Sequence, residues 1–329
     1  YGGWFQEVHG LQPDARLART LSQASDGSSF TAELSDGERV QASHVLVALG
    51  FGSFPYVPPE LARLVPARRM IHTLDLVDFD ALADQDVLIV GGRQSAYEWA
   101  ALLAEHGART VHLAHRHAAP RFAPADWTWV EPMLQASATS PGWFRRQTLA
   151  EQEATRLRFW AEGRLKLEPW LAPRIARPAV HVWEGASVAA ADEQDNGRLR
   201  VSLSTDTQIN VDRLVLATGY RVDVRRLSLL DGDAARDRQA LPAESSAADR
   251  SLLARLRSTS GFPSLDEDFQ SSVRGLFFSG LPATNDFGPF FGFVAGCRAA
   301  PLRILARILR DDPGRRDHPA LRHIGRSAA

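Results

Sequence analysis

The chain has 329 residues and 44% hydrophobic content, so it can bury a large core, and about two domains are expected. Its 38 basic and 39 acidic residues give a net charge of −1, which offers no attraction to nucleic acid or to an anionic membrane. The single cysteine, Cys297, excludes an intrachain disulfide, a C-x-x-C redox pair and a multi-cysteine metal site. No signal peptide or membrane-spanning apolar run is visible, so we expect a cytoplasmic protein with a small-molecule partner.

Three short strands are predicted near the N-terminus, at 30–34, 39–42 and 44–49, with residues 35–37 forming a hairpin turn between the first two. The first residue is Tyr1, and no strand followed by G-x-G-x-x-G precedes residue 86. We therefore expect the N-terminus to be truncated.

The most informative stretch is 86–98, DVLIVGGRQSAYE, in which an apolar strand ends at a glycine pair and a helix follows. Such a turn directs backbone N–H groups and the positive end of the helix dipole at one point, where a pyrophosphate fits. The G-x-G-x-x-G/A fingerprint falls on these six residues: Gly91, Gly92, Arg93, Gln94, Ser95 and Ala96. Arg93 replaces the second required glycine, and its guanidinium either binds phosphate or obstructs the approach.

The helix after this turn is expected to bury Ala96, Trp99, Ala100 and Leu103 and to stop at Gly107. A second strand at 110–114 then leads into Arg116. At this position an acidic residue reads a free ribose 2′-hydroxyl, whereas an arginine accommodates a 2′-phosphate. The pattern favours NADPH over NADH. The alternative is an ordinary βαβ unit in which Arg116 is simply solvated.

Residues 120–183 are mostly helical in pattern and contain six of the eight tryptophans. These rings are interpreted as core or interface anchors, with a substrate pocket as the alternative. The stretch 231–260 has little apolar periodicity and is expected to be a surface excursion.

A further buried strand is predicted at the start of 212–222, DRLVLATGYRV, and it stops at Thr218, Gly219 and Tyr220. It resembles the earlier VLVALG segment, since in both a strand of branched residues ends at alanine, one residue and glycine. Two similar strand ends suggest two nucleotide sites, although buried strands ending in glycine are common.

The C-terminal part predicts a strand at 275–279, a glycine-rich turn and a helix that buries Leu302, Leu305, Ile308 and Leu309. The turn around Gly288, Pro289, Phe290 and Phe291 either directs N–H groups at the pyrimidine edge of a flavin or only closes the sheet with its aromatic rings.

Together these segments resemble the two-dinucleotide-binding flavoproteins, and among them the class B flavin monooxygenases, especially the N-hydroxylating lysine and ornithine monooxygenases. GGRQSAYE at 91–98 is similar to that group's G-x-G-Q-S-A-x-E and departs from it at Arg93. Residues 212–220 fit its D-x-x-x-[L/F]-A-T-G-Y pattern in full, and the C-terminal Gly-Pro turn is similar to a final FAD contact.

The resemblance implies an α/β fold in which a Rossmann-like NADPH domain is inserted into an incomplete FAD-binding domain, with a small antiparallel β-meander. Residues 1–78 would belong to the first FAD segment, 79–217 to the NADP-binding domain with a helical insertion at 120–183, and 218–329 to the return FAD segment. NADPH would contact Gly91, Gly92, Gln94, Ser95, Ala96, Arg116 and Arg93. Thr218, Gly219 and Tyr220 would lie beside the nicotinamide, and Gly280, Gly288, Pro289 and Phe290 along FAD.

The implied reaction is oxygen transfer from a flavin hydroperoxide to a small nucleophile such as an amine, with NADPH and molecular oxygen consumed. No catalytic base is predicted, because the cofactor carries the chemistry. The alternatives are an NADPH–flavin reductase or oxidase that does not oxygenate, and a non-catalytic nucleotide-binding module. Neither a metal site nor a serine hydrolase is predicted, since the histidines lack metal-ligand spacing and G-x-S-x-G is absent. The oligomeric state is left open.

Overall fold

The computed structural model describes residues 2–231 and 251–311. By contact density the chain divides into two compact units, which are described separately. Unit 1 comprises the described parts of 1–48, 223–286 and 296–329, and unit 2 comprises 49–222 and 287–295. The chain therefore leaves unit 1 at residue 49, returns at 223, and leaves it a second time for residues 287–295.

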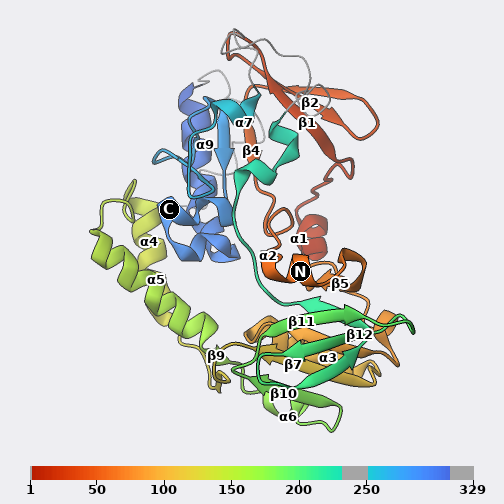
Figure 1. Ribbon diagram of the computed structural model, residues 1–329. Coiled ribbons are helices and arrows are strands. Elements are labelled where there is room, and N and C mark those ends of the chain that lie inside the picture. The colour runs from red at the N-terminus through yellow and green to blue at the C-terminus, as the bar shows by residue number, and fades with distance from the viewer. Residues whose placement is uncertain (1, 232–250, 312–329) are drawn as a thin grey trace. The chain divides into compact units, whose positions relative to one another are not determined.

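Unit 2 is built on a five-stranded parallel sheet with the order β10-β7-β6-β14-β5 (Figure 1). The strands are β5 (Met70–His72), β6 (Asp86–Val90), β7 (Thr110–His115), β10 (Val180–Glu184) and β14 (Arg213–Leu216). From β6 the chain moves outward through β7 to β10, and it then returns to the other side of β6 as β14. The order of the strands thus reverses between β6 and β14, which is where open α/β sheets bind ligands.

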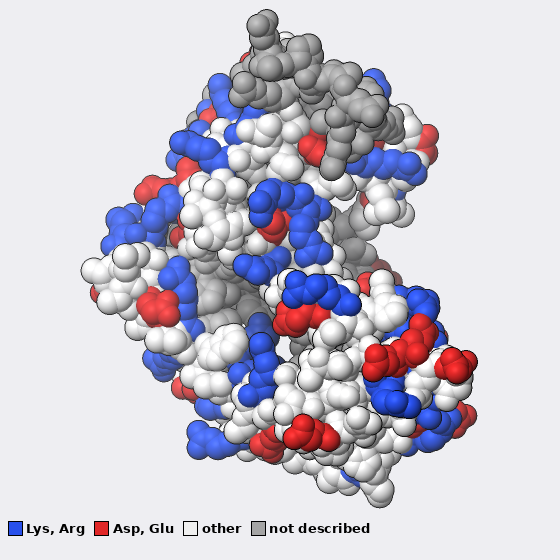
Figure 2. Space-filling model, viewed as in Figure 1, with Lys and Arg blue, Asp and Glu red and all other residues white. Residues whose placement is uncertain are grey.

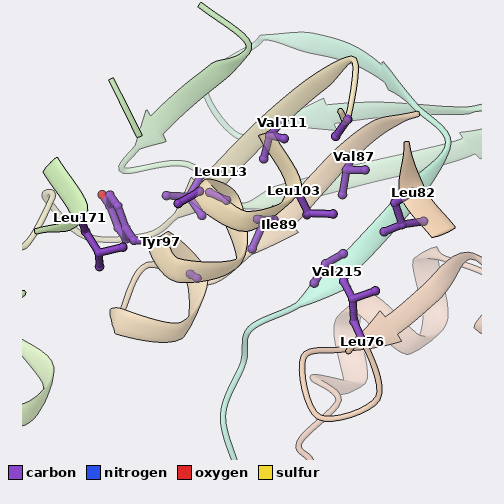
Figure 3. Close-up of a cluster of buried hydrophobic side chains, with 14 of the residues drawn as sticks. Leu76, Leu82, Val87, Ile89, Tyr97, Leu103, Val111, Leu113, Leu171 and Val215 are labelled. Carbon is purple, nitrogen blue, oxygen red and sulfur yellow. The ribbon is translucent and has the colours of Figure 1, made fainter. Parts of the chain in front are cut away.

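Each face of this sheet is covered by a different layer. Val87 and Ile89 of β6 pack with Leu103 of α3 (Gln94–Glu105), as Figure 3 shows. The intervening Leu88 packs on the opposite face with the antiparallel sheet of β11 (Val188–Glu193), β12 (Leu199–Leu203) and β13 (Gln208–Val211). Because successive strand side chains point to opposite faces and both faces are covered, residues 87–90 of β6 are all apolar.

The remaining elements of unit 2 are short strands and helices around this sandwich. They are α2 (Pro59–Leu64), β8 (Arg121–Phe122), α4 (Glu131–Thr139), α5 (Leu149–Arg164), β9 (Lys166–Leu167) and α6 (Leu171–Ile175). The α5 helix begins with a capping box, in which Thr148 and Glu151 each accept a backbone N–H from the other.

Unit 1 contains a three-stranded antiparallel sheet and a parallel strand pair. The sheet is β1 (Ala18–Gln23), β2 (Phe30–Leu34) and β3 (Arg39–Ala42), and the pair is β4 (Val45–Val47) with β17 (Leu276–Phe278). The other elements are α1 (Gly2–Val8), α7 (Leu252–Arg255), β15 (Ser258–Thr259), β16 (Phe262–Pro263) and α9 (Ala300–Asp311). A short helix, α8 (Thr284–Phe287), ends where the chain passes to residues of unit 2.

The predicted α/β fold class and the predicted strands and helices around residues 86–114 are confirmed. Two details of the side-chain burial differ from the prediction. The tryptophans of 120–183 are mostly not core, since Trp127, Trp160 and Trp170 are 42%, 48% and 47% exposed. In α9 the buried side chain is Ile304, whereas Leu302 is 56% exposed, because the helix presents a face rotated from the predicted one. Most of the predicted excursion at 231–260 lies outside the described residues.

Acidic and basic side chains both spread over the visible face of the molecule, as Figure 2 shows. This mixture agrees with the net charge of −1. Within 2–231 and 251–311, no helix combines the length and the apolar character needed to cross a membrane.

Candidate dinucleotide site

The turn after β6 is packed tightly between the ends of its two neighbouring strands. Gly91 has φ +140°, and its N–H donates to the carbonyl of Ala114 at 3.0 Å. A Cβ on Gly91 would lie 2.4 Å from the carbonyl oxygen of Ala217, and one on Gly92 would lie 2.3 Å from the ring of His115. Both glycines are therefore required by the packing of the turn against β14 and β7.

The helix α3 starts directly after this turn and has twelve residues. Arg93 is its N-cap, Ser95 is exposed in its first turn, and Ala96 is buried against the sheet. The unpaired N–H groups of a helix N-terminus carry partial positive charge. The predicted strand, turn and helix thus leave an exposed hydroxyl and a helix N-terminus at the carboxyl edge of the sheet.

The side chains of Arg93 and Gln94 turn toward the segment that follows α4. The Arg93 guanidinium lies 5.3 Å from the centre of the Trp160 ring, and its Nη1 donates to the Arg164 carbonyl at 2.9 Å. Burial, followed by the charge of Arg164, lowers the pKa of Arg93. The Gln94 Oε1 accepts the Glu168 N–H at 3.1 Å. Both residues tie the turn to residues 160–168.

A buried hydrogen-bond chain lies beneath the turn, and the sequence analysis missed it. The His115 Nδ1 is 2.8 Å from the His117 carbonyl oxygen, so Nδ1 carries the proton and Nε2 accepts from the Tyr97 hydroxyl at 3.1 Å. Burial lowers the pKa of His115 and raises the pKa of Tyr97 to about 12. Both groups are therefore neutral near pH 7, and they fix the ring against which Gly92 packs.

Arg116 follows β7 at the same edge of the sheet, because Val90 and Ala114 are paired in the parallel ladder. Its side chain is exposed, and within the described parts of the chain it makes no ion pair. A free guanidinium at this position suits a phosphate.

The end of β14 pairs with residues 55 and 56, which follow the VLVALG segment that the sequence analysis found similar to it. Thr218 Oγ1 donates to the Tyr56 carbonyl, and the Tyr56 N–H donates to the Gly219 carbonyl at 2.9 Å. Tyr220 forms a β-bridge with Pro55, and its ring, 37% exposed, lies 4.7 Å from that of Phe51. The strand of VLVALG, β4, instead pairs with β17 in unit 1.

The carbonyl of Gly219 also receives a hydrogen bond from a buried histidine. His72 Nδ1 accepts the Leu74 N–H at 3.1 Å, which leaves the proton on Nε2, 3.1 Å from the Gly219 oxygen. Gly219 itself has φ +77° and open space where a Cβ would be. This conformation favours glycine, and the bond from His72 holds it in place.

Asp212, the first residue of the D-x-x-x-L-A-T-G-Y pattern, lies at the opposite edge of the sheet from the glycine turn. Its Oδ2 accepts the Asp86 N–H at 2.8 Å, and its own N–H donates to the Asp86 carbonyl at 2.7 Å. Arg198 lies beside both carboxylates, with its Nε 3.2 Å from Asp212 Oδ1. This aspartate holds β14 in register with β6.

The residues predicted to lie along FAD are divided between the two units. Gly280, with φ +74°, follows β17 in unit 1, whereas Gly288, Pro289 and Phe290 belong to unit 2. A Cβ on Gly288 would lie 3.1 Å from the Phe290 ring, which is only 1% exposed and packs against Phe291. This ring therefore serves packing, and any contact of the segment with a ligand would come from its backbone. Among the described residues no group of His, Cys, Asp and Glu could hold a metal ion.

Residues 21–140 match the family model described as pyridine nucleotide-disulphide oxidoreductase. A ferredoxin–NADP reductase of Saccharopolyspora erythraea is 38% identical over 104 residues, which cover 31% of this chain and 30% of that protein. A trimethylamine monooxygenase of a Roseovarius species is 32% identical over 114 residues, which cover 34% of this chain and 25% of that protein. The matches thus span only about a quarter to a third of the length of these curated relatives.

Solved structures match nearly the whole chain. An ornithine N-hydroxylase of Kutzneria sp. 744 has a TM-score of 0.68 at 16% identity and covers 94% of this chain and 75% of that one. The L-lysine 6-monooxygenase of Pseudomonas syringae has a TM-score of 0.64 at 18% identity, and the match covers 94% of this chain and 74% of that one. The chain has a class B flavin monooxygenase-like fold. A bacillithiol disulfide reductase of Bacillus cereus shares this fold at a TM-score of 0.53 and 18% identity, and it covers 94% of this chain and 76% of that one.

Proposed function

We propose that this chain acts in an NADPH- and FAD-dependent oxidoreductase, and that the oxidoreductase is a flavin monooxygenase. The observation that carries the proposal is the glycine turn at the carboxyl ends of β6 and β14, followed by the first turn of α3, in which Ser95 is exposed. NADPH would place its pyrophosphate over Gly91, Gly92, Gln94, Ser95 and Ala96 and its 2′-phosphate on Arg116. Thr218, Gly219 and Tyr220 would lie beside the nicotinamide.

The residues of the turn fit a dinucleotide. Gly91 and Gly92 let the chain turn without side chains, Ser95 and Arg116 are exposed, and the neutral His115 and Tyr97 pair adds no negative charge beneath the turn. Gly280 has open space where a Cβ would be, and it is proposed as one flavin contact. The backbone of Gly288, Pro289 and Phe290 is proposed as another. FAD, when bound, supplies the redox chemistry, and the chain's residues bind and orient the two cofactors.

The proposed substrates are molecular oxygen and a small nucleophile such as an amine, and the proposed location is the cytoplasm. A disulfide reductase on this fold is disfavoured, because the chain has one cysteine. A specific observation favours a second candidate, an NADPH–flavin reductase or oxidase: the sequence matches above 30% identity include the ferredoxin–NADP reductase. The third interpretation is the non-catalytic nucleotide-binding module, which is favoured by the replacement of a fingerprint glycine by Arg93.

Purified protein supplied with FAD and NADPH separates these candidates. A monooxygenase consumes oxygen and NADPH and yields an oxygenated product when a series of amines is offered. A reductase or oxidase instead releases peroxide in proportion to NADPH with every amine tested. Protein that binds NADP⁺ but neither retains FAD nor consumes NADPH would leave only the non-catalytic nucleotide-binding module.

Replacement of Arg116 by alanine tests the coenzyme assignment directly. We expect the dissociation constant of NADPH to rise about 10- to 100-fold while that of NADH changes less than about twofold, because only NADPH carries the 2′-phosphate that a guanidinium pairs with. Arg121→Ala, an exposed arginine on β8, serves as the control. Equal effects of Arg116→Ala on both coenzymes would contradict the assignment.

A further inference from the structure

Arg93 stands where a dinucleotide turn ordinarily has glycine, yet its backbone does not need glycine. Its φ of −114° and ψ of −173° are extended values that any residue adopts. The substitution therefore acts through the side chain alone. A guanidinium at this point can lie over the turn, where the pyrophosphate would bind, or leave it.

In the structure the guanidinium leaves the turn and rests on α5. It lies over the Trp160 ring, 5.3 Å from its centre, and donates to the Arg164 carbonyl at the C-terminal end of α5. Tryptophan is the strongest aromatic partner of a cation, and the carboxyl end of a helix carries negative partial charge. Two independent attractions therefore hold the side chain in this position.

The neighbouring side chain is held in the same direction. Gln94 accepts the Glu168 N–H and donates from Nε2 to Glu98 at 2.8 Å. With Arg93 and Gln94 both directed at residues 160–168, Ser95 is the side chain that remains exposed in the first turn of α3. Residues 160–168 thus hold the side chains of Arg93 and Gln94 away from the glycine turn.

We propose that Trp160 is a positioning residue for the dinucleotide: its ring holds Arg93 against α5 and keeps the guanidinium clear of the backbone that receives the pyrophosphate. This inference rests on the proposed binding of NADPH at the turn. It gives α5 an indirect part in coenzyme binding, because the helix sets the position of the Arg93 side chain. It also explains how the chain accommodates an arginine in place of the fingerprint glycine.

A double-mutant cycle on the full chain tests this role, with NADP⁺ affinity measured by titration calorimetry. We expect Trp160→Ala to raise the dissociation constant about 3- to 30-fold, because a cation–π contact of ordinary strength is lost and Arg93 is free to cover the turn. In an Arg93→Gly background, Trp160→Ala should have no further effect on the affinity.

The chain provides a matched control in Trp170, which is 47% exposed and carries Arg174 over its ring at 5.2 Å. Trp170→Ala should leave NADP⁺ affinity unchanged. Trp160→Phe, which keeps a weaker aromatic ring, should give an intermediate affinity. Thermal unfolding of each variant separates loss of affinity from loss of fold.

Three outcomes would overturn the inference. Trp160→Ala could weaken binding equally with and without Arg93, which would assign Trp160 a role independent of the arginine. It could leave the affinity unchanged. Arg93→Gly could by itself weaken binding more than Trp160→Ala does, which would make Arg93 a phosphate ligand. Wild-type protein that binds no NADP⁺ would instead refute the proposed function, and this inference with it.

Discussion

Two adjacent glycines in the turn after β6 meet different obstacles. Gly91 combines φ +140° with a backbone neighbour, the Ala217 carbonyl, whereas Gly92 faces the ring of His115. The His115 ring is held by its bonds to Tyr97 and His117, and the backbone of β14 by its ladder with β6, so a Cβ on either glycine would clash. Only Gly91 adds the strain of a positive φ to this clash. Gly91 is therefore the less replaceable of the two.

Gly91→Ala should lower the free energy of unfolding by about 2 kcal/mol or more, because the added Cβ both clashes with Ala217 and strains the backbone. Urea denaturation measures this. Gly52→Ala is the control, since its Cβ would meet only Leu49 at an ordinary 3.8 Å, and it should stay within about 1 kcal/mol of wild type. Equal stability of the two variants would show that the turn is not packed as described.

His112 on β7 makes stability depend on pH. Its Nδ1 accepts from the Trp183 indole at 3.2 Å and its ring stacks on His181, so the neutral form is the one that fits. Burial, and then the charge of His181, lowers the pKa of His112 from 6.5 to about 4, with Asp86 opposing. The unfolded state therefore binds more protons between these values, and stability present above pH 6.5 is lost as the pH falls toward 4.

Urea midpoints at pH 7.5 and pH 5 test this expectation. His112→Gln should show a smaller loss of stability between the two pH values than wild type, because a group that would take up a proton on unfolding has been removed. His9→Gln is the control, because His9 is exposed and follows α1. It should lose as much stability between pH 7.5 and pH 5 as wild type does. If His112→Gln retains it too, His112 is not the group responsible.

At the scale of elements, the register of β6 and β14 is fixed at the edge of the sheet away from the glycine turn. The Asp86 N–H donates to the Asp212 carboxylate, and the Asp212 N–H donates to the Asp86 carbonyl. Arg109 pairs with the Asp86 carboxylate, and Arg198 pairs with that of Asp212. A one-residue slip would move every side chain of β14 to the wrong face. The conformation of the turn therefore depends on contacts at the other end of the strands.

Asp212→Ala should lower the free energy of unfolding by about 1–3 kcal/mol, the usual cost of removing a charged hydrogen-bond partner. It should leave NADP⁺ affinity within about twofold, since Asp212 is not at the coenzyme edge of the sheet. Thermal unfolding and titration calorimetry measure the two effects. Asp192→Ala on β11 is the control for loss of an exposed carboxylate. A large loss of NADP⁺ affinity at an unchanged free energy of unfolding would show that Asp212 takes part in coenzyme binding.

The elements that could be predicted from sequence are those whose signal is local. β6, α3 and β7 combine apolar runs, a glycine pair and helical periodicity, and the hairpin of β2 and β3 has a Ser-Asp-Gly turn. β11 was not predicted because Val188–Glu193 is mostly alanine and acid, and it becomes a strand by pairing with β12. The contacts of Arg93 with Trp160 and of His115 with Tyr97 join distant residues, so no local pattern could indicate them.

At the scale of the whole chain, both hydrophobic clusters described for the parallel sheet lie in unit 2. The three turns assigned to NADPH, after β6, β7 and β14, also lie there. Unit 1 contributes Gly280 to the proposed flavin contacts but nothing to the proposed NADPH contacts. The proposed NADPH contacts therefore lie in unit 2 alone, whereas the proposed flavin contacts are divided between unit 1 and residues 288–290 of unit 2.

Hydrogen exchange with and without NADP⁺ tests this division. At a concentration of about 100 times the dissociation constant, binding should stabilise the competent state by about 2.7 kcal/mol. We expect slower exchange at 91–97, 115–117 and 217–220, where the coenzyme would cover or immobilise the backbone, and unchanged exchange in β1, β2 and β3. FAD added alone should instead protect residues around Gly280. Protection by NADP⁺ in β1–β3 of the same size as at 91–97 would contradict the assignment of the coenzyme to unit 2.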